Sequence, residues 1–290
     1  MDDLVVGSDS LIGNVLINYL KEINYYPIST TRRLNLVNER NLFLDFYHIG
    51  NFAYHHFRNV YFCAGETSIA KCEADPNKTA FINVEATFNL AKKLKESGAQ
   101  IIFISSNTVF DGSKDYPNED EKYSFTTTYG RQKSEAELKL LSLGAGIKIV
   151  RITKVISPKT QILSFILEKI KSKKSCELFN DLFISPLSIQ YLCQMLVKIA
   201  ESPEDGIFHL SGAENFSYAD FAINLASFMN ADISLINGIP STDILYKPKF
   251  ARLGMEKTQR LLHISSESLD SLFSNLLSDH SYENLSLPNL

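Results

Sequence analysis

The chain has 290 residues, of which 44% are hydrophobic and 21% are charged. This composition is globular and excludes a disordered or collagen-like chain. Lys and Arg together number 29, against 33 Asp and Glu, and no long basic run is present, so we expect no nucleic-acid partner. The apolar runs are too short to cross a bilayer, so we also expect no membrane association.

The chain opens with Met-Asp-Asp and enters an apolar segment at once, which favours a protein without a signal peptide. Its four cysteines stand apart, with no CxxC pair, as is typical of free thiols in a reducing compartment. We therefore expect a cytoplasmic protein without a metal site. The adjacent His55 and His56 have no third ligand at metal spacing and are interpreted as a surface or partly buried pair.

The first half of the chain alternates short apolar segments with longer segments of helical periodicity. Strands are expected at residues 4–6, 26–30, 42–46, 59–63, 101–105 and 148–152, and helices at 11–23, 76–98 and 129–143. Such alternation is typical of βαβ units, in which right-handed crossovers build a parallel sheet covered on both faces. The sequence therefore predicts an α/β fold with a Rossmann-like, doubly wound parallel sheet.

The pattern changes near residue 158. Helical segments are expected at 162–171, 188–201 and 218–229, short strands at 176–179 and 207–210, and a helix with a loose end after residue 265. We interpret residues 1–158 as the Rossmann core. Residues 159–290 are mainly a smaller C-terminal α/β lobe of the same compact unit, some of whose strands can return to the core. A substrate is expected in the crevice between sheet and lobe.

A glycine loop joins the first strand to the first helix. Gly7 permits a tight turn and Gly13 lets the helix pack close to the sheet, so that free N–H groups face a pyrophosphate. Ser10 replaces the middle glycine that such loops usually have, which narrows the approach to phosphate. By itself the pattern fits a glycine turn between any strand and helix equally well.

Basic residues, and no acidic one, follow the second strand. A carboxylate there would bind an adenosine ribose, whereas the guanidinium of Arg32 or Arg33 can fork onto a 2′-phosphate. This favours NADP(H) and leaves NAD(H) as a second option, while a solvated basic turn is the alternative for one of the two arginines. Asp45, beside Phe46, is a candidate for contacting the adenine amino group, or else a surface carboxylate.

Three residues with hydroxyl or ammonium side chains, Ser106, Tyr129 and Lys133, come after the core of the fifth expected strand. Tyr129 and Lys133 form a Tyr-x-x-x-Lys pair one helical turn apart. A free tyrosine has a pKa of roughly 10, and we expect Lys133 and a cationic nicotinamide to lower the pKa of Tyr129. Tyr129 could then exchange a proton with a carbonyl oxygen during hydride transfer, and Ser106 is placed to donate a hydrogen bond to the same oxygen. Taken alone, such a pair is more often a feature of a helix surface.

At these residues the chain resembles the extended short-chain dehydrogenase/reductase superfamily, and within it the dTDP-4-dehydrorhamnose reductase-like, sugar-nucleotide-binding family. The likeness spans most of residues 4–262 and is strongest over 101–137, where residues 109–112, Glu119 and residues 129–133 match the family signature. The resemblance implies an NAD(P)H-dependent reductase of a nucleotide-linked 4-keto-6-deoxysugar. In it, Tyr129 supplies a proton, Lys133 tunes Tyr129 and contacts ribose, and Ser106 polarises the carbonyl.

The resemblance also implies the extent of the site. The expected cofactor-binding residues are Gly7, Ser10, Leu11, Ile12, Gly13, Arg32, Arg33, Asp45, Phe46, Cys63, Ala64, Gly65, Asn83, Ser105, Tyr129, Lys133 and Ile152. The expected substrate-binding residues are Thr67, Ser106, Asn107, Thr108, Tyr129 and Thr153. Where family members usually have Thr-Asp-Tyr, this chain has Ser106-Asn107-Thr108, which changes the substrate wall.

Two alternatives stay open. One is a sugar-nucleotide epimerase of the same superfamily; a dehydratase is disfavoured because Asn107-Thr108 offers no Asp-Glu pair. The other is a non-catalytic, NADP-binding regulatory subunit, since relatives can keep the fold and the dinucleotide site. A nucleotide sugar is the expected partner, and a homodimer is a further option. The charged run from Glu119 to Lys122 is interpreted as a solvated loop.

Overall fold

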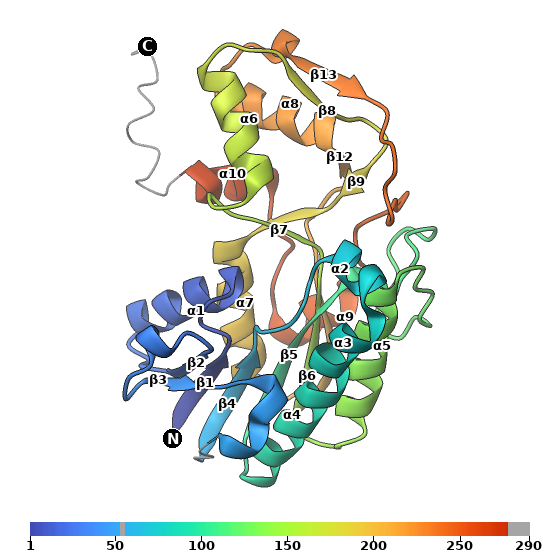
Figure 1. Cartoon of the computed structure of the whole chain (residues 1–290). Coiled ribbons are helices and arrows are strands. Elements are labelled where there is room, and N and C mark those ends of the chain that lie inside the picture. The colour runs from blue at the N-terminus through green and yellow to red at the C-terminus, as the bar shows by residue number, and fades with distance from the viewer. Residues whose placement is uncertain (53–55, 278–290) are drawn as a thin grey trace.

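A parallel sheet of seven strands forms the centre of the computed structural model, which describes residues 1–52 and 56–277 (Figure 1). The strand order is β11-β6-β5-β4-β1-β2-β3, and all neighbours are parallel. The strands are β1 (Asp2–Val6), β2 (Ile28–Thr31), β3 (Asn41–Phe43), β4 (Phe57–Phe62), β5 (Gln100–Ser106), β6 (Ile147–Ile152) and β11 (Gly206–Leu210). The order reverses between β1 and β4, and such a switch point is where open α/β sheets bind ligands. The predicted Rossmann-like α/β class is confirmed.

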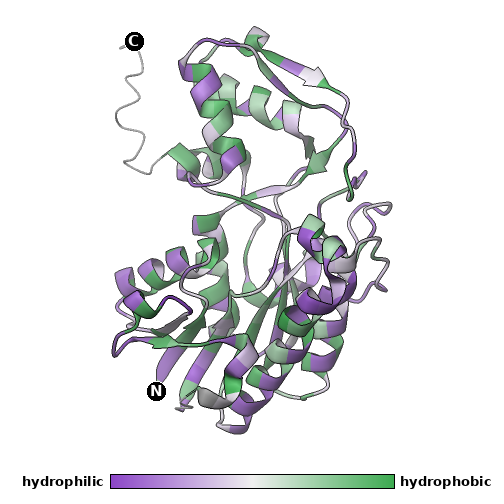
Figure 2. Ribbon diagram, viewed as in Figure 1, coloured by the Kyte–Doolittle hydropathy of each residue, from purple (hydrophilic) through white to green (hydrophobic). Residues whose placement is uncertain are grey.

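Helices cover both faces of this sheet. Helices α1 (Leu11–Glu22) and α7 (Ile189–Glu201) lie on one face, and α4 (Thr87–Glu96) and α5 (Thr128–Leu141) on the other. Alternate strand residues face the two layers, so both layers are apolar. In Figure 2 the strands in the middle of the sheet are accordingly largely hydrophobic, and the helix surfaces that face away from the sheet are largely hydrophilic.

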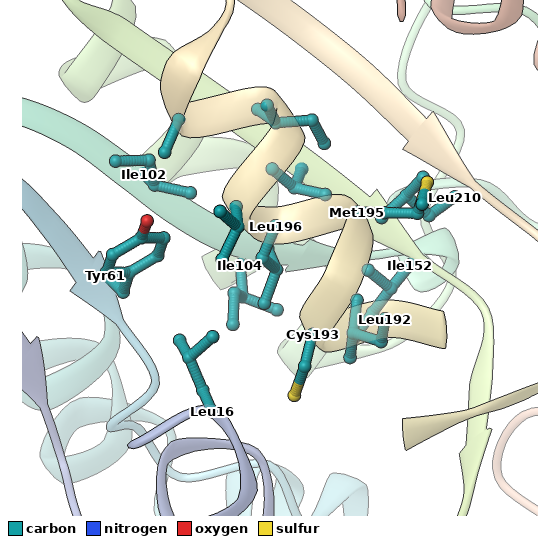
Figure 3. Close-up of a cluster of buried hydrophobic side chains, with 14 of the residues drawn as sticks. Leu16, Tyr61, Ile102, Ile104, Ile152, Leu192, Cys193, Met195, Leu196 and Leu210 are labelled. Carbon is teal, nitrogen blue, oxygen red and sulfur yellow. The ribbon is translucent and has the colours of Figure 1, made fainter. Parts of the chain in front are cut away.

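Figure 3 shows the core on the α7 side of the sheet. Leu196 of α7 lies beside Ile104 of β5 and Leu192 lies beside Ile152 of β6, with Tyr61 of β4 on the other side of Ile104. All five side chains are buried. This packing fixes the strand ends from which the residues of the candidate site project.

The predicted helix at 76–98 is present, but it is not uniform. It begins as α3 (Pro76–Ala80), passes through a π-helical turn (Phe81–Ala86) and continues as α4. The short α2 (Ile69–Ala74) precedes it. π-Helical turns inside α-helices are frequent at functional sites, and this one carries the buried Asn83.

The remaining elements form a smaller lobe beyond the carboxyl ends of the sheet strands (Figure 1). Its apolar core is separate from the cores of the main sheet. Its elements are α6 (Gln161–Lys171), β8 (Cys176–Phe179), β9 (Phe183–Ile184), β12 (Phe216–Ser217), α8 (Tyr218–Phe228), β13 (Ile236–Ile239) and α10 (Leu269–Leu277). At the neck between core and lobe, β7 (Lys154–Ile156) pairs with β10 (Pro186–Ser188).

Two expectations about individual strands are wrong. The strand at 207–210, expected with the lobe, is β11 of the main sheet and pairs with β6, with Phe208 opposite Val150. Its apolar sequence suits a strand covered on both faces, which sequence alone cannot assign to one sheet or another. The strand expected at 42–46 ends at Phe43, because Asp45 caps a 3₁₀ helix at Phe46–Asn51.

The division of the chain at residue 158 stays a prediction. Elements after that residue contribute to both parts of the structure, since α7, β11 and the short α9 (Glu256–Leu262) pack with the main sheet. Within the described ranges, no helix has the length and apolar character needed to cross a membrane.

Candidate active site

Two adjoining hollows run along the carboxyl ends of the central strands. The first, of about 480 Å³, lies between the sheet and the lobe. The second, of about 900 Å³, lies over the ends of β1, β2 and β3. Ser10, Ala64 and Gly65 line both, so the hollows meet at the glycine loop. The groove therefore crosses the switch point of the sheet, between β1 and β4.

The glycine loop has a backbone that only glycine allows at two positions. Gly7 has φ +95°, and a Cβ added there would lie 2.8 Å from Cβ of Ala64. A Cβ at Gly13 would lie 2.2 Å from the carbonyl oxygen of Gly7. The first turn of α1 is thus pressed against β1, as close approach to a phosphate requires.

Ser10 acts as the N-cap of α1. Its Oγ accepts a hydrogen bond from the Gly13 N–H at 3.0 Å and donates one to the Gly7 carbonyl at 2.9 Å. The hydroxyl is folded against its own loop, and the residue still lines both hollows. Serine at the middle glycine position is thus compatible with the turn, although it uses one of the helix N–H groups.

The second hollow gathers the residues predicted to hold an adenosine. Arg32 and Arg33 are exposed at its edge, and Asp45 and Phe46 lie in its wall. The Asp45 carboxylate accepts hydrogen bonds from His48 and from the backbone N–H of Tyr47, which lower the pKa of Asp45. Asp45 is therefore held as an anion in a fixed orientation facing this hollow.

Ser106, Tyr129 and Lys133 meet in the wall of the first hollow. The Thr127 side chain caps α5 by accepting from the Gly130 N–H, and a Cβ at Gly130 would lie 2.1 Å from the Thr108 carbonyl oxygen. This contact brings the start of α5 against the end of β5. The Ser106 hydroxyl accepts hydrogen bonds from the N–H and the hydroxyl of Thr108 at 3.2 and 3.0 Å, and it lies close enough to Tyr129 to influence the pKa of Tyr129.

The surroundings of these three residues set their proton affinities. Burial raises the pKa of Tyr129, and the Ser106 hydroxyl opposes this shift. Burial lowers the pKa of Lys133 to about 8, while Glu137 opposes the shift. Burial thus dominates the pKa values of both side chains, and the expectation that Lys133 and a cationic nicotinamide lower the pKa of Tyr129 stays a prediction.

Contacts with β5 fix the Lys133 side chain. Its Nζ donates a hydrogen bond to the Ile104 carbonyl at 2.8 Å and lies 4.4 Å from the centre of the Phe103 ring. The same atom is 5.8 Å from the centre of the Tyr129 ring. The ammonium is thus fixed beneath the tyrosine, one helical turn away.

Most of the other predicted residues border one of the two hollows. The first is lined by Ser10, Leu11, Ile12, Cys63, Ala64, Gly65, Thr67, Ser105, Asn107, Thr108, Ile152 and Thr153. Gly7 lines the second. Gly13 and Asn83 border neither. Asn83 instead accepts from the Glu66 N–H and donates to Gln132, both at 2.9 Å, and so fixes the loop that follows β4.

The lobe side of the first hollow contains residues that sequence reasoning missed. Lys154, Phe183, Tyr218 and Tyr246 line it. The Tyr246 hydroxyl donates to the Phe110 carbonyl at 3.2 Å, across 136 residues of sequence. No local motif marks these positions, because tertiary folding alone brings them to the cavity.

A buried ion pair lies behind the site. Arg151 Nε and Nη2 donate to Oε2 of Glu137 at 3.0 and 2.8 Å, and both side chains are at most 1% exposed. Tyr123 donates to the same oxygen at 3.0 Å, and Ser105 donates to Oε1. Glu137 is one turn beyond Lys133 on α5, so the pair anchors the helix face that carries Tyr129.

Glu119 does not lie in a solvated loop. It is 2% exposed, and its Oε1 accepts from the N–H and the hydroxyl of Thr258 at 3.0 and 2.8 Å. The expectation of a solvated loop holds for the neighbours Asp120 and Lys122, which face solvent, but not for Glu119. Glu119 ties the segment before α5 to the start of α9. Of the expected histidine pair, His55 lies outside the described residues, and His56 is exposed.

The sequence matches the family described as the RmlD substrate binding domain over residues 1–280. The chain belongs to this family. The match confirms the resemblance drawn from the motifs around Ser106, Tyr129 and Lys133.

Other proteins of known identity are similar to this member of the RmlD substrate-binding family. Methionine adenosyltransferase 2 subunit beta of Rattus norvegicus is 26% identical over 277 residues, covering 89% of this chain and 81% of that protein. The dTDP-4-dehydrorhamnose reductase of Shigella flexneri is 25% identical over 212 residues, covering 68% of this chain and 71% of that protein. The crystal structure of dTDP-4-dehydrorhamnose reductase from Bacillus anthracis in complex with NADP superposes with a TM-score of 0.82 at 20% identity, covering 96% and 99% of the two chains.

The buried His209 generates a prediction about stability. Its ring accepts from Arg151 at Nε2 and donates to the Gly254 carbonyl from Nδ1, at 3.2 and 2.8 Å. Burial, with Arg151 and Lys257, lowers the pKa of His209 from 6.5 to about 3. Below pH 6.5 the His209 imidazole is therefore protonated in the unfolded chain but stays neutral in the folded chain. As the pH falls from 6.5 to 5, this difference lowers the free energy of unfolding by about 2 kcal/mol.

Urea denaturation at a series of pH values measures this effect. The variant His209→Gln should lose this part of the pH dependence, while the exposed His263→Asn should keep it. An identical pH slope in wild type and His209→Gln would contradict the assignment of a neutral, buried imidazole.

Proposed function

We propose that this protein is an NADP(H)-dependent reductase of a nucleotide-linked 4-keto-(6-deoxy)sugar. The observation that carries the proposal is that Ser106, Tyr129 and Lys133 share one cavity wall with the glycine loop and face the lobe across it. Membership of the RmlD substrate-binding family and the similarity to named dTDP-4-dehydrorhamnose reductases support it.

The residues along the groove suit a dinucleotide. Gly7 and Gly13 leave the first turn of α1 free of side chains on the side that meets β1. The pyrophosphate would lie at this loop and the adenosine in the second hollow, beside Asp45. Arg32 and Arg33 at the edge of that hollow favour a 2′-phosphate, and so NADP(H) over NAD(H). The bound nicotinamide would supply the hydride.

Tyr129 is the proton donor in this proposal. Because burial raises its pKa, the phenol stays protonated at neutral pH and can give its proton to the keto oxygen as that oxygen becomes an alkoxide. Ser106 donates a hydrogen bond to the same oxygen, while its own Oγ accepts one from Thr108 Oγ1 at 3.0 Å. The Lys133 ammonium, fixed beneath the ring, stabilises the phenolate that remains.

A second candidate function is a regulatory subunit that binds NADP without turnover. The observation that favours it is the changed substrate wall, where the Asn107 side chain donates a hydrogen bond to the Ala251 carbonyl at 2.8 Å. The similarity to methionine adenosyltransferase 2 subunit beta is in keeping with it. A subunit of this kind would bind NADPH and show no reduction of any keto sugar.

The cofactor assignment predicts stronger protection by NADPH than by NADH in thermal unfolding. In the double variant Arg32→Ala/Arg33→Ala, the NADPH shift should fall to the NADH shift, because the contacts to the 2′-phosphate are gone. The variant Lys21→Ala removes an exposed cation from α1 and serves as the control, with the wild-type NADPH shift expected. Equal shifts with both dinucleotides in the wild type would refute the role of the arginines.

The proton-transfer assignment predicts a specific loss in Tyr129→Phe. Turnover of a nucleotide-linked 4-keto-6-deoxysugar, followed by NADPH absorbance, should drop by roughly 100-fold or more, because the proton donor is absent. Protection by NADPH should be unchanged. Tyr26→Phe, at an exposed position, should keep full turnover. Wild-type turnover in Tyr129→Phe would exclude Tyr129 as the donor, and no turnover in the wild type would favour the regulatory subunit.

A further inference from the structure

Lys154 is a cation in the wall of the first hollow that the proposed reaction does not use. It is the first residue of β7, at the neck, where it is exposed to solvent and borders the cavity. Its backbone lies opposite Pro186 of β10, so the position is fixed by strand pairing. The surrounding walls lower the pKa of Lys154 through desolvation.

In the part of the chain that the structure describes, Lys154 has no counter-charge. Within residues 1–52 and 56–277, no carboxylate forms an ion pair or hydrogen bond with Lys154. Among the described residues that line the first hollow, the only charged ones are two lysines, and Lys133 already donates a hydrogen bond to the Ile104 carbonyl. By contrast, Lys247 of the connection to the lobe is neutralised by Asp181 at 2.6 Å. The first hollow is therefore a positively charged cavity in a chain with a formal charge of −4.

The place of Lys154 in the cavity lies between its two ends. Ile152 pairs with Ser106 across β6 and β5, and Lys154 comes two residues later along the chain, where it passes toward the lobe. Tyr129 is at the core side of the cavity, and Phe183 and Tyr218 are at the lobe side. A ligand that reacts at Tyr129 and extends toward the lobe therefore lies in a cavity that Lys154 also borders.

We propose that Lys154 is a specificity-determining residue that pairs with an anionic group of the bound nucleotide sugar. This inference rests on the proposed function and adds the chemistry of the substrate. Two groups supply that anion: the diphosphate, or a carboxylate carried by the sugar itself. In either case an unpaired ammonium in a partly desolvated cavity selects a charged ligand over a neutral one.

Binding of defined ligands to wild type and to Lys154→Met tests the inference. The probes are UDP, dTDP, UDP-glucose and UDP-glucuronic acid, measured by isothermal titration calorimetry. Affinity should fall roughly 10- to 100-fold in Lys154→Met, as for loss of a charge-assisted hydrogen bond. Lys154→Arg should restore most of it. Lys159→Met removes an exposed lysine outside the cavity and should bind as the wild type does. Unchanged melting temperatures check that the variants fold.

The pattern across the probes identifies the anion. If the diphosphate is the partner, Lys154→Met weakens all four ligands alike. If a sugar carboxylate is the partner, the wild type prefers UDP-glucuronic acid to UDP-glucose, and only UDP-glucuronic acid is weakened. Equal binding of every probe by wild type and Lys154→Met overturns the inference and leaves the proposed function standing. If the wild type binds none of the probes, the proposed function fails, and the inference fails with it.

Discussion

The ion pair between Glu137 and Arg151 is the constraint on which the candidate site depends. Two charges removed from water are costly, and they are tolerated only where their geometry and further hydrogen bonds compensate. Here a bidentate guanidinium, a tyrosine hydroxyl and a serine hydroxyl all converge on one carboxylate. Breaking such a pair on one side leaves a buried, uncompensated charge. The contact therefore fixes α5 against β5 and β6 in one register.

The functional geometry follows from that register. Tyr129, Lys133 and Glu137 are spaced four residues apart, so fixing the last of them places the first two at the end of β5. The glycine loop of β1 and the neck at β7 supply the other walls, and both depend on the same sheet. Rigid strands thus position Ser106, Tyr129 and Lys133, while the lobe closes the far side of the cavity.

Sequence alone predicted the features that depend on local spacing. The alternation of strands and helices, the glycine turn and the Tyr-x-x-x-Lys pair each depend on residues that are close in sequence. Their relative placement follows from a parallel sheet. Lys154 and Tyr246 could not be found in this way, since long-range folding brings them to the cavity. Burial also could not be predicted from the sequence. It places Glu119 in the interior, where it contacts α9, and it raises the pKa of Tyr129, whereas the neighbouring charge of Lys133 by itself predicts a lower pKa.

A double-mutant cycle on the unfolding free energy tests the central claim most directly, using Glu137→Gln, Arg151→Met and the two together. The account predicts that Glu137→Gln alone costs about 3–5 kcal/mol, because Arg151 is left buried without its partner. The double variant should be less destabilised than the sum of the single variants by at least about 2 kcal/mol. Simple additivity would contradict the account, because it would mean that the two charges do not hold α5 on the sheet together.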